Sequence, residues 1–451
     1  MQIDPSIFKS YDIRGIYGQN LFDSTAEAVA RAFIKYLNFP KEVIVGKDGR
    51  ISGKQLSAKL IKTLTLLGTN VIDIGLTSTD MFYFACAEKK LPGIMVTASH
   101  NPKEYNGFKM VKHIPFLLSG DEGIGQMREM IKNDELPANA TKVGTIRKLD
   151  VMPDFINKIA SLIDAKSLKP MTVLADMANG MGGTILENLK TKLPTITFVP
   201  MYWEVDGTFP NHGGDPLQLE NRQELMARVP KDNADLGIAF DPDGDRFFVV
   251  DKTGRFISGD FMTAILSDYF LKRYPGSPIV YDIRASQVVP DTINRAGGKP
   301  LYNRVGHSHI KPRMINEKAC FGGEVSGHYY FSDFYYCDSA AVSMLFLLEF
   351  LSKSPKRLDQ IVDEMESKYF ISGEINSTVT DIPAKLAQVE KKYAANAKEI
   401  IHIDGITMEM GDWRFNLRGS NTEPLLRLCM EAKNKKLMEE KRDELLQLIR
   451  S

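Results

Sequence analysis

Short apolar segments alternate with helical segments along most of this chain, and this alternation restricts the folds open to it. The apolar run 43–46 precedes a helical run over 54–67, and a second apolar run over 70–75 follows. The same order recurs further along, with strands expected at 93–96, 172–176 and 278–282. Strands that alternate with helices are typical of α/β layers with largely parallel pairing. The sequence therefore predicts an α/β fold.

The length of the chain predicts more than one domain. A single hydrophobic core stops growing at about 250–300 residues, and this chain has 451. We therefore expect about three or four domains. Candidate boundaries are the polar stretch 133–152, the turn 252–254 and the charged segment 363–368. An amphipathic helix is predicted over 435–450.

Charge and cysteine content argue against several classes of function. Lys+Arg and Asp+Glu both number 57, so no basic excess indicates binding to nucleic acid or to an anionic membrane. The four cysteines have no C-x-x-C spacing, which argues against a zinc site or a disulfide framework. The apolar stretch 340–351 is too short to span a bilayer and predicts a buried helix. The first residues lack the charged and apolar regions of a signal peptide, so we expect a cytoplasmic protein.

Residues 241–246 (D-P-D-G-D-R) place three carboxylates and an arginine directly after the apolar run 236–240. Carboxylates this close repel one another, and a hard cation is the usual reason, because Mg²⁺ and Ca²⁺ prefer carboxylate oxygens. A solvated acidic turn between two strands is the alternative. A calcium loop does not fit, because Arg246 stands at its glycine position and Lys252 at its glutamate position. The Mg²⁺ ligands expected here are Asp241, Asp243 and Asp245.

Two further loops suit phosphate chemistry. The strand expected at 93–96 runs into T-A-S-H-N-P, where Pro102 restricts Asn101 to extended or turn geometry. The hydroxyl of Ser99 is therefore presented in a loop at a strand end. Residues 418–424 (R-G-S-N-T-E-P) combine a guanidinium with two hydroxyls and an amide. This donor set suits phosphate oxygens, which Arg418 can bind bidentately, although a polar turn could have the same composition.

These segments together resemble a known family. T-A-S-H-N-P, D-P-D-G-D-R, G-E-V-S-G-H (323–328) and R-G-S-N-T-E-P occur in this order and resemble the four active-site loops of the α-D-phosphohexomutase family. F-K-S-Y-D-I-R-G (8–15) is similar to the family's opening segment, so the resemblance covers almost the whole chain. It is closest to the phosphomannomutase/phosphoglucomutase type.

The resemblance implies three related α/β domains with mixed, largely parallel sheets, followed by a smaller C-terminal α+β domain. We expect each domain to carry one active-site loop. The domains and loops are 1–151 with the phosphoserine loop, 152–254 with the metal loop, 255–366 with the sugar-recognition loop and 367–451 with the phosphate loop.

A reaction follows from the same resemblance. The family's active-site serine is phosphorylated, and Ser99 stands at that position, where its phosphoryl group would complete the Mg²⁺ shell. The implied reaction is the reversible interconversion of hexose 1-phosphate and hexose 6-phosphate, with hexose 1,6-bisphosphate as intermediate and activator. The intermediate must rotate within the site so that its other phosphate faces Ser99. A separate loop therefore holds whichever phosphate lies away from Ser99. The residues implied for that task are Arg418, Ser420, Asn421 and Thr422, with Arg427 near them.

Other positions match the family one at a time. Arg14 and Lys109 match groups that stabilise the reacting phosphoryl group, and His328 is a candidate acid or base. Arg284 departs from the pattern, because many relatives have a lysine there and an arginine does not deprotonate at working pH. Contact with a phosphate or hydroxyl stays open to it. The substrate-binding positions implied are Tyr11, Arg246, Arg284, His307, Glu324 and Ser326.

The sequence restricts the range of expected sugar substrates but does not distinguish mannose from glucose. Glu324 and Ser326 match a loop that contacts the 3- and 4-hydroxyls, which glucose and mannose share. The glucosamine branch typically has a glutamine in the sugar loop and R-P-S-G-T-E-P in the phosphate loop, and this chain has neither. Phosphoglucosamine mutase is therefore less favoured. A sugar phosphatase with Asp241 as nucleophile and an inert sugar-phosphate binding protein are further alternatives, but both leave several of the motifs unexplained.

Overall fold

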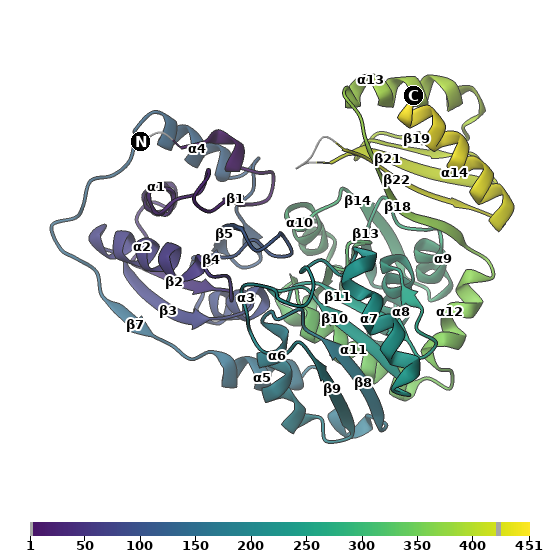
Figure 1. Ribbon diagram of the computed structural model, residues 1–451, viewed down its shortest axis with the longest axis horizontal. Helices are drawn as coiled ribbons and strands as arrows, with labels where there is room; N and C mark the ends of the chain where they lie inside the picture. Colours follow the sequence, from purple (N-terminus) through teal and green to yellow (C-terminus); the bar gives the residue numbers. More distant parts are fainter. Residues whose placement is uncertain (1–2, 421–424) are drawn as a thin grey trace. The chain divides into compact units, whose positions relative to one another are not determined.

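The computed structural model describes residues 3–420 and 425–451. The chain forms two compact units. The first comprises the chain up to Phe256 together with His328–Ser354, and the second comprises Ile257–Gly327 and Pro355–Ser451. Figure 1 labels the helices and strands. In the part of the chain described, no helix combines the length and the apolar character that crossing a bilayer requires. The predicted domain limits at 151, 254 and 366 stay a prediction.

The first sheet has the strand order β1-β5-β4-β2-β3-β7, with β6 beside β5. Strands β2, β3, β4 and β7 pair in parallel, whereas β5 runs antiparallel to β1 and β4. The predicted strands at 43–46, 70–75 and 93–96 are confirmed. The bounds are β1 (Ile13–Ile16), β2 (Glu42–Lys47), β3 (Asn70–Leu76), β4 (Gly93–Val96), β5 (Tyr105–His113), β6 (Phe116–Leu117) and β7 (Ile146–Lys148).

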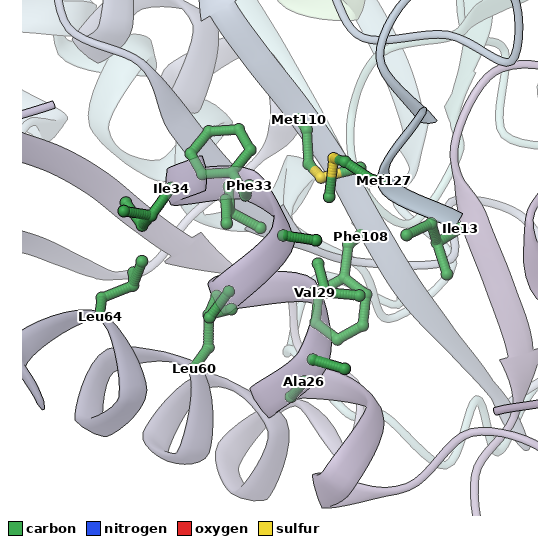
Figure 2. Close-up of a cluster of buried hydrophobic side chains, with 14 of the residues drawn as sticks. Ile13, Ala26, Val29, Phe33, Ile34, Leu60, Leu64, Phe108, Met110 and Met127 are labelled. Atoms are coloured by element: carbon green, nitrogen blue, oxygen red, sulfur yellow. The ribbon is translucent and has the colours of Figure 1, made fainter. Parts of the chain in front are cut away.

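Three helices, α1, α2 and α4, form a hydrophobic core with strands β1–β5 of this sheet. In α1 (Asp23–Tyr36), Ala26, Val29 and Phe33 are buried at helical spacing, so one face of the helix is apolar. Figure 2 shows these side chains gathered with residues of α2 and β5, such as Leu60 and Phe108. The helical run predicted over 54–67 is confirmed by α2. The other bounds are α2 (Gly53–Leu66), α3 (Thr79–Lys89) and α4 (Ile124–Lys132).

The second sheet has the order β12-β11-β10-β8-β9. Strand β10 pairs in parallel with β8 and antiparallel with β11, so residues 241–246 connect two adjacent strands. The predicted buried helix at 340–351 is confirmed by α11, which packs against α5, α6 and β11. The strands are β8 (Met171–Asp176), β9 (Ile196–Met201), β10 (Leu236–Phe240), β11 (Phe247–Asp251) and β12 (Phe256–Ile257). The helices are α5 (Met152–Ala160), α6 (Gly182–Leu189), α7 (Leu219–Lys231) and α11 (Ala340–Lys353). The first unit also contains the antiparallel pair β16 (Tyr329–Phe331) and β17 (Cys337–Asp338).

The second unit contains two kinds of sheet. Strand β13, flanked by β14 and β15, pairs in parallel with both. The C-terminal sheet, in the order β18-β22-β21-β20-β19, is antiparallel throughout and has its own core. This combination confirms the predicted α/β class and the α+β character of the C-terminal part. The strands are β13 (Pro278–Asp282), β14 (Lys299–Asn303), β15 (Phe321–Gly323), β18 (Phe370–Thr378), β19 (Glu399–Ile401), β20 (Ile406–Glu409), β21 (Trp413–Gly419) and β22 (Leu425–Ala432). The helices are α8 (Gly259–Arg273), α9 (Val288–Arg295), α10 (His307–Glu317), α12 (Leu358–Glu366), α13 (Ile382–Tyr393) and α14 (Lys435–Arg450).

Candidate active site

The acidic turn between β10 and β11 is buried. Asp241 and Asp243 are 0% exposed and Asp245 is 2% exposed, which excludes a solvated turn. One oxygen from each carboxylate lies within 4.8 Å of the others. Gly244 has φ +75°, a conformation that glycine adopts at little cost, and it allows the chain to turn this tightly. Three carboxylates therefore converge in the first unit.

Lys109 of β5 partly neutralises this cluster. Its Nζ lies 2.7 Å from Asp243 Oδ2 and 2.5 Å from Asp245 Oδ2. Burial lowers the pKa of Lys109, but the two carboxylates outweigh burial and hold that pKa above its usual value. Burial raises the pKa of Asp241, and Asp245 and Asp243 raise it further. The cluster thus retains a carboxylate whose negative charge is disfavoured in the absence of a further cation.

The remaining oxygens fit a metal ion. Among the described residues, Oδ1 of Asp243 and Oδ1 of Asp245 are buried and have no hydrogen-bond partner. A buried carboxylate oxygen without a donor is costly, and a hard cation would satisfy it. The donor set is entirely oxygen, which suits Mg²⁺ better than softer metals. Asp241, Asp243 and Asp245 could therefore hold a metal ion.

Ser99 lies against this cluster. It follows β4 in a loop and is 1% exposed, and its Oγ donates to Asp241 Oδ2 at 3.0 Å. Its backbone N–H donates to Thr97 Oγ1 at 2.9 Å. Ser99 has φ +51°, in the left-handed region that few residues other than glycine adopt. The expected presentation of this hydroxyl at a strand end is what the structure shows.

Two of the predicted residues, Arg14 and Arg246, lie beside the serine loop and the cluster. Arg14 donates from Nε to Asp12 and from Nη1 to the carbonyl oxygen of Ala98, in the serine loop, at 3.2 Å. Arg246 Nε lies 3.8 Å from Asp241 Oδ2.

His328 Nε2 lies 3.6 Å from Asp245 Oδ1. Burial, followed by the charge of Arg246, lowers the pKa of His328 to about 3. Tyr11 is half-buried in the segment before β1.

The sugar loop belongs to the second unit. Glu324 follows β15, is 2% exposed, and accepts a hydrogen bond from Gly306 N at 2.9 Å. Gly306 immediately precedes His307, the first residue of α10, so two of the predicted sugar-contacting residues come from segments that bond to each other. Ser326 is half-buried in the same loop.

Arg284 is held by carboxylates. Its Nε and Nη2 donate to the two oxygens of Asp282 at 3.0 and 2.9 Å, and its Nη1 donates to Glu374 at 2.7 Å. Asp282 Oδ2 also accepts from the N–H of Val325 in the sugar loop at 2.8 Å. The guanidinium thus supports that loop, and only its other N–H groups remain for a phosphate or hydroxyl.

The phosphate loop begins where β21 ends. Arg418 on β21 is paired across the sheet with Arg427 on β22. Arg427 donates to Glu374 at 3.0 Å and to Ser420 Oγ at 3.4 Å. Arg418 is 4% exposed, and among the described residues its Nε has no hydrogen-bond partner. Burial and the neighbouring Arg284 lower its pKa, so an anion would be stabilised here. Asn421 and Thr422 lie outside the described residues.

Sequence reasoning missed several residues at this site. Thr79, the first residue of α3, donates to Asp243 Oδ2 at 2.6 Å. Asp48 and Arg50 are buried immediately after β2. Strands β2, β3 and β4 are parallel, and the loops after their carboxyl ends share one edge of the sheet, where α/β proteins bind ligands. Applying that rule to 48–50 and 77–79 would have found them.

The fold and the cluster define the class of protein: a multidomain α/β enzyme with a buried serine and carboxylates at the carboxyl ends of its strands. Family models described as "Phosphoglucomutase/phosphomannomutase" match almost all of the chain. They are alpha/beta/alpha domain I over residues 5–135, domain II over 153–254, domain III over 258–369 and the C-terminal domain over 374–448. The chain belongs to the phosphoglucomutase/phosphomannomutase family, a family of isomerases that interconvert hexose phosphates.

Individual proteins agree with this assignment. The chain is 37% identical to a phosphomannomutase of Salmonella montevideo, with 98% of this chain and 99% of that protein covered. It is 38% identical to a phosphomannomutase of Vibrio cholerae, with 98% of each covered. A phosphoglucomutase/phosphomannomutase family protein of Burkholderia thailandensis has a similar crystal structure, with a TM-score of 0.90 and 31% identity over 99% of this chain and 98% of that one.

Proposed function

We propose that this protein reversibly converts hexose 1-phosphate into hexose 6-phosphate, with mannose or glucose as the sugar and Ser99 as the phosphoryl carrier. The observation that carries the proposal is the hydrogen bond from Ser99 Oγ to Asp241 inside the buried carboxylate cluster. A serine hydroxyl is a weak nucleophile, and it gains reactivity from an adjacent base or metal. The names of the similar phosphomannomutases support the choice of sugar.

The proposed reaction has two transfers. In the first, the P–O bond to Ser99 Oγ breaks as a bond to the sugar's 6-oxygen forms. The 6-hydroxyl loses its proton, which His328 is proposed to pass on, and Ser99 Oγ takes up a proton and becomes a hydroxyl. The product is hexose 1,6-bisphosphate, which rotates within the site before the second transfer. The bond from its other phosphate to the 1-oxygen then breaks as a bond to Ser99 Oγ forms. Ser99 Oγ loses its proton in this step, and the 1-oxygen takes up a proton. Hexose 6-phosphate leaves, and Ser99 is again phosphorylated.

Charge stabilisation is the main task of the first unit in this scheme, because phosphoryl transfer develops charge on the phosphate oxygens. We propose that Asp241, Asp243, Asp245 and the Ser99 phosphate hold Mg²⁺, which offsets that charge when bound. Arg14 and Lys109 add positive charge beside the same oxygens. Arg246 and Tyr11 are proposed to contact the substrate.

Substrate recognition is the proposed task of the second unit. Glu324, Ser326 and His307 would bind sugar hydroxyls, and Arg284 is proposed to contribute its remaining N–H groups. Arg418, Arg427 and Ser420, with Asn421 and Thr422, would bind the distal phosphate. Hexose 1,6-bisphosphate would also act as activator, because it can phosphorylate an unmodified Ser99.

Replacing Ser99 by alanine tests the carrier. Active wild-type protein should show phosphoserine in the Ser99 peptide by mass spectrometry, stable to hydroxylamine, and Ser99→Ala should lose most turnover while keeping its fold. Ser57→Ala, which changes a buried serine on α2 outside the site, should keep both phosphate and turnover. Full activity of Ser99→Ala, or a hydroxylamine-labile phosphate on Asp241, would contradict the proposal. Initial rates on mannose, glucose and glucosamine 1-phosphates would then rank the substrates, with glucosamine 1-phosphate expected to be slowest.

A further inference from the structure

The loop that presents Ser99 is bonded to a buried arginine outside the set of residues implied by the family motifs. We propose that Arg50 is a positioning residue, whose guanidinium fixes the backbone of this loop so that Ser99 Oγ faces the carboxylate cluster. The inference rests on the proposed carrier role of Ser99 and adds a residue that controls its geometry.

Four carbonyl oxygens, three in this loop and one at the start of β5, accept hydrogen bonds from this one side chain. Nη2 of Arg50 donates to the carbonyl oxygens of Ser99 and Asn101, both at 2.6 Å. Nη1 donates to those of Pro102 at 2.7 Å and Tyr105 at 2.9 Å. A guanidinium is planar and rigid, so these bonds fix the positions of the carbonyl groups relative to one another. The loop between β4 and β5 is therefore shaped around Arg50.

The arginine is itself held in place. Its Nε lies 3.3 Å from Asp48 Oδ2, both side chains are almost fully buried, and the ring of Phe209 covers the guanidinium at 5.3 Å. The same Asp48 oxygen accepts from Thr97 Oγ1 at 2.7 Å, and Thr97 Oγ1 accepts from the N–H of Ser99 at 2.9 Å. The carbonyl oxygen and the N–H of Ser99 are thus both tied to the Asp48–Arg50 pair.

This bonding explains why Ser99 keeps an unfavourable backbone conformation. A serine at φ +51° needs support from its surroundings, because the left-handed region is disfavoured for residues with a Cβ. The side-chain hydrogen bonds of Arg50 go to backbone carbonyl groups, whereas the Ser99 hydroxyl bonds to Asp241. Arg50 therefore acts on the reaction through the position of Ser99, and a displacement of about 1 Å at a reacting group can cost about 100-fold in rate.

The first variant is Arg50→Lys, which keeps the charge but has a single nitrogen and cannot bond to four carbonyl groups in one plane. We expect kcat to fall about 100-fold, with KM for mannose 1-phosphate changed by less than about threefold, because the guanidinium bonds to backbone carbonyl groups. Phosphorylation of Ser99 by glucose 1,6-bisphosphate, followed by mass spectrometry, should slow by the same factor. Mg²⁺ affinity, measured by calorimetry, should stay within about threefold of wild type, since the carboxylates are unchanged.

The matched control is Arg222→Lys. Arg222 also donates to two backbone carbonyl groups, those of Pro216 and Leu217, and stacks on Phe256 at 3.9 Å. It should lose stability without losing kcat. If Arg50→Lys does not fold, Asp48→Asn provides a second test, because it removes the charge that holds Arg50 with little change of shape. It should show the same fall in kcat.

The outcomes separate the two proposals. Suppose that the wild type has phosphoserine and mutase activity. The role of Arg50 alone would then be overturned if folded Arg50→Lys kept the wild-type kcat, or if Arg222→Lys lost as much kcat as Arg50→Lys. A rise of about 100-fold in the KM of Arg50→Lys for mannose 1-phosphate, in place of the fall in kcat, would also overturn the role of Arg50. Active wild-type protein without phosphoserine would overturn the carrier role of Ser99 and this inference with it.

Discussion

At the scale of single residues, the two carboxylate oxygens of Asp243 differ in their hydrogen bonding. Its Oδ2 accepts hydrogen bonds from Thr79 at 2.6 Å, Lys109 at 2.7 Å and Thr97 at 3.3 Å. Its Oδ1 is buried without a partner among the described residues. One oxygen thus orients the carboxylate and the other is left for a ligand. A structural turn would satisfy both oxygens.

Removing one of these charges should weaken metal binding. Asp243→Asn keeps the shape but takes one negative charge from a site that must compensate a dication. We expect Mg²⁺ affinity to fall at least tenfold, or about 1.4 kcal/mol, and turnover to fall with it. Asn at 241 or 245 should act similarly. Calorimetric titration with Mg²⁺ measures the first effect, and a chelator should inactivate the wild type reversibly.

Asp251→Asn is the control, because Asp251 is equally buried on β11 and bonds to Thr253 and Arg255 outside the cluster. It should leave Mg²⁺ affinity unchanged. Activity that persists in metal-free buffer with chelator would refute the metal assignment.

At the scale of elements, loops are fixed by side chains at strand ends. The segment 209–212 (F-P-N-H) contacts the end of β8. His212 Nε2 lies 3.0 Å from Asp176 Oδ2, and its Nδ1 lies 2.8 Å from the carbonyl oxygen of Gly213. Both ring nitrogens face acceptors, and only the imidazolium form donates from both. Burial lowers the pKa of His212, but the bond and charge of Asp176 outweigh burial and raise it.

This contact predicts a pH dependence of stability. A histidine whose pKa is raised by folding contributes stability that is complete below its unfolded pKa, about 6.5, and is lost as pH rises through the folded pKa. Glu224, the other acidic group that raises this pKa, acts in the same direction. We expect the melting temperature of the wild type to fall more between pH 6 and 8 than that of His212→Gln. Asp176→Asn should remove the same difference, and parallel curves for wild type and both variants would disprove the contribution.

At the scale of the whole molecule, ion pairs join segments near the proposed sugar and phosphate loops within the second unit. Arg284, which follows β13, pairs with Glu374 on β18 at 2.7 Å, and Glu374 pairs with Arg427 on β22 at 3.0 Å. Burial alone would raise the pKa of Glu374, but the two arginines lower it. The segment after β13 is therefore bonded to two strands of the C-terminal sheet, β18 and β22.

Substitutions in the sugar loop and in the phosphate loop should change the kinetics in different ways. Arg418→Ala removes a charged hydrogen-bond donor from the bound phosphate and should raise KM for every hexose phosphate alike. The expected fall in kcat/KM corresponds to roughly 2–4 kcal/mol. Glu324→Gln should affect glucose and mannose 1-phosphates about equally, since both present the same 3- and 4-hydroxyls. Inhibition by inorganic phosphate provides the measurement, because Arg418→Ala should weaken it and Glu324→Gln should not. Sharp discrimination between the two sugars by Glu324→Gln would show that this loop contacts other hydroxyls.

Local sequence patterns were enough to predict many of the elements. Strand β4 and helix α14 have the bounds expected, 93–96 and 435–450. Strand β10 coincides with the apolar run before the acidic turn. These predictions succeed because a strand buried on both faces needs a continuous apolar run, and a helix on a surface needs an apolar stripe at helical spacing. The motif chemistry of Ser99 and the three aspartates is also local, since each motif lies within six residues.

The partners of these motifs depend on the tertiary structure. Thr79 bonds to Asp243 from 164 positions away, and Arg50 bonds to the Ser99 loop from 49 positions away. Nothing in either local segment specifies the other, because strand order and helix packing decide which strand ends become neighbours. Burial of the acidic turn has the same origin: D-P-D-G-D-R has the composition of a solvated hairpin, and only the packing around it removes water. The sequence alone therefore predicts the elements and the reactive groups, whereas long-range packing determines which groups support them and which charges lack a partner.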